Sequence, residues 1–179
     1  MHDIVASVEA LRDGSITLLS ELVSHASLLG NEQSAQDVIK RVFADDLELE
    51  VQALIIDESQ IKDHPGYSPS LVSYEGRVNV IGTHRPWVAQ GKSIIFNGHI
   101  DVVPVGDERL WTQPPFQPWI DGDKLIGRGA SDMKAGIVSY IMECVVKILE
   151  VLMGCVANTV SFIRVAAFGL AHAGLFVAI

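Results

Sequence analysis

Two short segments carry the side chains with the clearest potential for chemistry. In FNGHIDVVPVG, residues 96–106, His99 and Asp101 stand two positions apart where an apolar run ends in a Pro/Gly turn. If the run is a strand, both side chains project from its carboxyl end, because residues two apart face the same way. Open α/β sheets usually carry their sites at that edge. One interpretation is a metal-bound imidazole whose other ring nitrogen donates to a carboxylate, and a hydrogen-bonded pair without a metal is the alternative.

The second segment, GRGASDMKAG, is a glycine-rich loop at residues 127–136 that leads into a helical pattern, with Asp132 at the helix entry. A helix N-terminus favours a carboxylate, and it also favours a bound phosphate. The third glycine of the dinucleotide-binding fingerprint is missing, however, and Asp132 would repel a phosphate. The carboxylate is better explained as a ligand of a cation, with a simple helix cap as the alternative.

Composition limits the classes of protein to which the chain can belong. The chain has 179 residues, enough for one domain with a real core. Its net charge of −9 argues against a nucleic-acid partner. Cys144 and Cys155 lack metal-ligand spacing, and charges within the first apolar stretch argue against a signal peptide. We therefore expect residues 1–142 to be soluble and cytoplasmic.

The remaining patterns predict the elements that position these residues. Apolar spacing predicts an amphipathic helix over residues 4–25 and a second helix over residues 35–47, capped by Ser34. Strands are expected at 47–56, where the chain enters a core, and at 77–84 and 92–100. Asp121 and Gly122 predict a hairpin turn, and helical periodicity returns after residue 136. Helices on both sides of several strands favour an α/β fold.

With both motifs in this order, residues 4–142 resemble the zinc-dependent amidohydrolases of the acetylornithine deacetylase, succinyl-diaminopimelate desuccinylase and aminoacylase group. GHIDVVP, PPFQP and GRGASDMKAG carry the resemblance. It implies that His99 binds one zinc, that Asp101 serves catalysis by orienting His99, and that Asp132 bridges two zincs, for which cobalt can substitute. The implied fold is a mixed α/β sheet flanked by helices. The implied reaction is hydrolysis of an N-acyl amino acid or a peptide amide by metal-activated water, often in a homodimer.

The sequence lacks the other residues that this family uses. A zinc takes about four ligands, and a catalytic zinc also needs a general base. The family places a Glu-Glu pair, another acidic ligand and a distant histidine after the bridging aspartate, whereas no Asp or Glu follows Glu150 here. We therefore expect residues 1–142 to be a truncated catalytic domain that is inactive by itself, with a plain α/β domain as the alternative.

Residues 143–179 are expected to form a separate apolar helical tail. Residues 155–179 are long enough as a helix to cross a bilayer, although a buried core helix or a broken reading frame would give the same composition. LEVLMGCVANTVSFIRVAAFGLAHAG resembles the membrane helix of subunit I (subunit a) of V-type or archaeal-type rotary ATPases. That resemblance implies a membrane-inserted stator fragment with Arg164 and His172 on a proton pathway. The two resemblances meet mid-helix without a linker, as at an artificial join.

Overall fold

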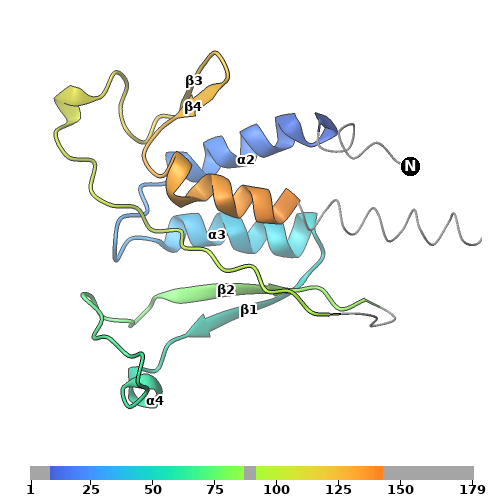
Figure 1. Ribbon diagram of the computed structural model, residues 1–179, viewed down its shortest axis with the longest axis vertical. Helices are drawn as coiled ribbons and strands as arrows, with labels where there is room; N and C mark the ends of the chain where they lie inside the picture. Colours follow the sequence, from blue (N-terminus) through green and yellow to red (C-terminus); the bar gives the residue numbers. More distant parts are fainter. Residues whose placement is uncertain (1–8, 87–91, 143–179) are drawn as a thin grey trace, which may run out of the picture.

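A helical layer packed on two antiparallel strands forms the body of the molecule (Figure 1). The computed structural model describes residues 9–86 and 92–142. The layer comprises α2, Arg12–Ser24, α3, Gln33–Arg41, and a helix at residues 135–142. The strands are β1, Glu50–Ile55, and β2, Val78–Thr83, which pair from Glu50 opposite Thr83 to Ile55 opposite Val78. The described part therefore has an α/β architecture.

Short elements connect these parts. A π-helical turn, Val42–Asp46, prolongs α3, and α4, Glu58–Ile61, lies between β1 and β2. A 3-10 turn, Glu108–Leu110, precedes a hairpin of β3, Trp119–Asp121, and β4, Lys124–Ile126. Gly122 turns the hairpin at φ +61°, a backbone conformation that glycine adopts without steric cost. The hairpin predicted from the Asp-Gly pair is confirmed.

The hydrophobic core lies where the three helices meet. Leu22 of α2 is fully buried, Val38 and Ile39 of α3 are buried, and Val138 and Ile141 join them from the last helix. Positions three and four apart fall on one face of a helix, so each helix presents a single apolar stripe to the others. The two predicted helices are confirmed over the residues that the structure describes.

The predicted cap of α3 was wrong. The helix begins at Gln33 with Glu32 as its N-cap residue, so Ser34 lies inside the first turn. The side chain of Glu32 accepts hydrogen bonds from the Gly30 N–H and from Arg77 instead of capping the helix. The chain therefore enters α3 two residues earlier than the serine pattern indicated.

The predicted strand at residues 92–100 does not form. These residues run as extended chain, and the side chains of Ile94 and Ile95 are 73% and 89% exposed. Beyond them, a single parallel bridge joins Leu28 to Val102. The last helix covers part of this segment, since Phe96 stacks on Tyr140 and Ile100 is buried. Residues of high strand propensity still need a hydrogen-bonded neighbouring strand, and among the described residues none pairs with 92–100.

The expected mixed sheet, flanked by helices on both sides, also differs from the structure. Both sheets of the described chain are two-stranded and antiparallel. The three core helices lie on one side of β1 and β2 in Figure 1. Leu54 and Ile55 of β1 are 47% and 61% exposed, so β1 does not enter a core as predicted.

Within residues 9–86 and 92–142, no helix is both long and apolar enough to span a membrane. The expected tail helix, with Arg164 and His172, lies outside the described residues. Its membrane insertion and its proton-pathway residues stay predictions.

Candidate metal-binding site

His99 lies between two carboxylates, and the three predicted site residues of the body come together. The Nδ1 atom of His99 lies 3.3 Å from Oδ1 of Asp101 and 3.1 Å from the Asp101 carbonyl oxygen. The Nε2 atom lies 3.3 Å from Oδ1 of Asp132. This distance is within the roughly 5 Å that two ligands of one ion require. The roles given to the three residues, as ligand, orienting group and bridging ligand, stay predictions.

The three side chains are open to solvent. Those of His99 and Asp101 are 47% and 43% exposed, and that of Asp132 is 84% exposed. They line a cavity of about 200 Å³ together with Gly127, Arg128, Gly129 and Ser131. Exposed ion pairs contribute little to stability. The fold therefore gains almost nothing from the contact of His99 with Asp132, which favours a role in binding over a structural one.

The geometry of His99 and Asp132 fits two ligands of one metal ion. A neutral imidazole has one N–H, so when Nδ1 donates to Asp101, the Nε2 lone pair faces the carboxylate of Asp132. A cation between Nε2 and Oδ1 would remove this repulsion. For bonds of 2.0–2.2 Å, two tetrahedral zinc ligands lie about 3.3 Å apart, which agrees with the observed separation.

The described residues do not complete such a site. Asp101 and Asp132 contact different ring nitrogens of His99, so the three side chains do not surround one point. Within residues 9–86 and 92–142, no group of three or more His, Cys, Asp or Glu side chains is arranged to hold a metal ion. A catalytic zinc takes about three protein ligands and a water. His99 and Asp132 thus fit part of a zinc site, and further ligands would have to come from outside these ranges.

Two glycines of the GRG motif allow the Asp132 loop to approach its neighbours closely. A Cβ atom on Gly127 would clash with Cγ1 of Val23, and one on Gly129 would clash with Cγ1 of Val102. Gly129 also has φ +80°, which side chains rarely permit. Packing against α2 and residue 102 accounts for these glycines, so the phosphate-binding alternative is not needed to explain them.

Asp132 does not act as a conventional helix cap. It lies within the wide turn Ala130–Lys134, whose N-cap residue is Gly129. Among the hydrogen bonds of the described residues, none joins its carboxylate to a backbone N–H. Its contact is with His99. The helix-cap alternative is therefore unsupported, and the side chain is directed to the candidate site.

Lys134, two positions after Asp132, is a buried charged residue that the sequence analysis missed. It is fully buried, and its Nζ atom donates hydrogen bonds to the carbonyl oxygens of Leu22, at 2.7 Å, and His25, at 2.9 Å. Burial lowers the pKa of Lys134 to about 8. Its partners are main-chain carbonyls, which carry no sequence signal, so residue types alone could not have revealed the contact.

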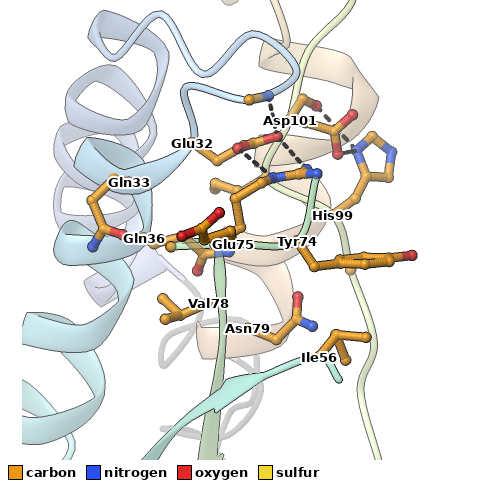
Figure 2. A pocket seen from close by; sticks show the side chains of 15 residues that line it. Glu32, Gln33, Gln36, Ile56, Tyr74, Glu75, Val78, Asn79, His99 and Asp101 are labelled. Atoms are coloured by element: carbon orange, nitrogen blue, oxygen red, sulfur yellow. Dashed lines mark hydrogen bonds and ion pairs between the residues drawn. The ribbon is translucent and has the colours of Figure 1, made fainter. Parts of the chain in front are cut away.

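A second cavity, of about 270 Å³, adjoins His99 and Asp101 (Figure 2). Its wall includes a salt bridge of 2.7 Å between Glu32 and Arg77, which the sequence analysis also missed. Burial by itself would raise the pKa of Glu32, but hydrogen bonds from the Gly30 N–H and from Arg77 hold this pKa below its ordinary value. The pair links the start of α3 to the residue before β2.

Comparison with known proteins supports the resemblance of the body. Residues 95–152 match the model of peptidase family M20/M25/M40. A stretch of 67 residues is 40% identical to a succinyl-diaminopimelate desuccinylase of Buchnera aphidicola subsp. Baizongia pistaciae (strain Bp), covering 36% of this chain and 18% of that protein. The match thus spans less than a fifth of the relative.

The position of the family match fits the candidate site. It includes His99, Asp101 and Asp132, and it ends at residue 152, before Arg164 and His172. These similarities support a relationship of the matched segment to hydrolases of this peptidase family. They lend no support to the resemblance of the tail to an ATPase stator.

Proposed function

We propose that His99 and Asp132 contribute two zinc ligands in a metal-dependent hydrolase that acts on N-acyl amino acids or peptide amides. The separation of 3.3 Å between Nε2 of His99 and Oδ1 of Asp132 carries the proposal, because it equals the spacing of two ligands on one ion. The match of residues 95–152 to a peptidase family gives independent support.

Each residue has a separate part in this proposal. Asp101 faces Nδ1 of His99, so it holds the ring in the tautomer whose Nε2 lone pair is free to bind a cation. Asp132 is the most exposed of the three side chains and supplies a carboxylate oxygen. When bound, zinc would supply a Lewis acid and an activated water.

The described residues hold two of the required donors, so we expect the 179-residue chain to bind zinc weakly and not to hydrolyse substrate by itself. Loss of a general base alone removes a factor of about 10² to 10⁴. Hydrolysis of N-acetyl amino acids and dipeptides should be undetectable with zinc or cobalt added. Turnover that His99→Ala abolishes would contradict this expectation and show that another chain or a second copy completes the site.

Zinc affinity tests the proposal directly. Competition with a chromophoric chelator should show at least about tenfold weaker binding in His99→Ala and in Asp132→Ala, since each removes a ligand. His84→Ala and Asp123→Ala are matched controls, because both residues are exposed and lie outside the site. Equal affinities in the unmodified chain and both site variants would refute the shared ion.

A further inference from the structure

The chain segment that follows α2, residues 25–28, contacts both halves of the candidate site. Ser27 is fully buried, and its hydroxyl donates to the carbonyl oxygen of Ile100 at 2.7 Å. The carbonyl oxygen of Ser27 accepts from the Val102 N–H at 2.8 Å. The residues on either side of Asp101 are therefore fastened to Ser27 by buried or main-chain hydrogen bonds.

Hydrogen bonds also hold the Asp132 loop to Leu22, near the end of α2, and to His25. Lys134 follows Asp132 by two positions, and its Nζ atom binds the carbonyl oxygens of Leu22 and His25. The Leu22 carbonyl oxygen also accepts from the His25 N–H at 3.3 Å, and its second lone pair is available to Lys134. A buried ammonium group in turn needs such partners.

The contact within the site is too weak to hold these two segments together. His99 and Asp132 are exposed, and exposed pairs are screened by water and contribute little. Lys134 and Ser27 are both fully buried, where hydrogen bonds are stronger and costly to lose. The buried contacts of Lys134 and Ser27, together with the close packing of Gly129 on Val102, are therefore the interactions that can set the separation of His99 from Asp132.

We propose that Lys134 and Ser27 are positioning residues. Lys134 holds the Asp132 loop to the carbonyl oxygens of Leu22 and His25, Ser27 holds the His99–Asp101 segment, and together they set the distance between His99 and Asp132. This geometric role stands independently of the metal. Its effect on zinc affinity rests on the proposed function.

Nuclear magnetic resonance of the metal-free 179-residue chain tests the geometry. The unmodified chain should show a nuclear Overhauser contact between the imidazole protons of His99 and the β-protons of Asp132. In Lys134→Met this contact should be lost while the amide signals of β1 and β2 keep their positions. Ser27→Ala should weaken it. Lys40→Met and Ser34→Ala are matched controls on the exposed side of α3 and should retain it.

Zinc affinity provides the second measurement. Residues that orient metal ligands typically affect affinity by about 10- to 100-fold, so Lys134→Met should bind zinc more weakly by that factor. If the unmodified chain binds no zinc but Lys134→Met still loses the Overhauser contact, the positioning role stands and the metal proposal falls.

Lys134→Met can also contradict the positioning role. A folded Lys134→Met variant that keeps both the Overhauser contact and the zinc affinity would overturn the positioning role of Lys134 while leaving the metal proposal intact. If Lys134→Met does not fold, the Overhauser contact and the zinc affinity of Ser27→Ala test the positioning role instead. Absence of the Overhauser contact in the unmodified chain would overturn the proposal at its start.

Discussion

The helical layer and the strand region of this molecule both contain large apolar side chains, but these side chains differ in their exposure to solvent. In the helical layer, made of α2, α3 and residues 135–142, Leu22 and Val23 are fully shielded from solvent. In the strand region, made of β1, β2 and residues 92–97, Ile94 and Ile95 are 73% and 89% exposed. Apolar residues are buried only where another described element covers them.

The candidate site lies at the boundary of these two regions. His99 follows the exposed extended segment, yet its neighbours Ile100 and Val102 are buried and bind Ser27. Asp132 belongs to a loop that Lys134 holds against α2. The helical layer therefore sets the geometry of the site. The exposed strand region leaves the site accessible to solvent.

Truncating one apolar side chain to alanine in each region should give the largest difference in the free energy of unfolding. Leu22→Ala should lower the free energy of unfolding by about 2–5 kcal/mol, because it leaves a cavity in the core. Ile95→Ala should change it by less than about 0.5 kcal/mol, because the side chain is exposed. Urea denaturation of both variants measures this, and similar losses would show that Ile95 is covered in solution.

A pair of glycine substitutions gives the next largest effect. Gly127→Ala should destabilise the fold by about 1–3 kcal/mol, because the new methyl group meets the stiff side chain of Val23. Gly14→Ala meets nothing within 4 Å in the exposed part of α2. It should stabilise the fold by about 0.5–1 kcal/mol through helix propensity. Thermal unfolding distinguishes the two, and a neutral Gly127→Ala would show that the loop is not held against α2.

The salt bridge between Glu32 and Arg77, which links the start of α3 to the residue before β2, should make the stability of the fold depend on pH. The pKa of Glu32 lies below its ordinary value of 4.5 when folded, so its stabilisation is complete above pH 4.5 and is lost as the pH falls through the folded pKa. Glu32→Gln should remove about 1 kcal/mol at pH 7 and flatten the decline in acid. Glu50→Gln, which removes an exposed pair with Arg85, is the control. Parallel curves for the Glu32 variant and the unmodified chain would contradict the prediction.

The smallest effect on the described fold is expected from shortening the chain. Deleting residues 155–179 should raise the soluble yield, because a long apolar segment promotes aggregation. It should leave the unfolding midpoint of the helical layer and the zinc affinity of His99 and Asp132 unchanged. Loss of the folded body on deletion would mean that these residues belong to its core and that the division after residue 142 is wrong.

The sequence by itself determined the features that depend on local pattern. Apolar spacing predicted α2 and α3, because a buried stripe recurs every three or four residues. The Asp-Gly pair predicted the β3–β4 hairpin, because one of its two residues needs a left-handed backbone. The family resemblance carried by the two motifs implied that His99 and Asp132 meet, and their side chains lie 3.3 Å apart.

Only the tertiary structure decided the features that depend on partners distant in sequence. Ser34 has the residue type of a cap, but the chain enters α3 through Glu32, which Arg77 holds from 45 positions away. Residues 92–100 have strand propensity, but no strand of the described chain pairs with them. Lys134 can be buried because the carbonyl oxygens of Leu22 and His25 accept hydrogen bonds from its ammonium group. Main-chain acceptors and covering surfaces leave no mark on residue identity, so they become visible only when the chain is folded.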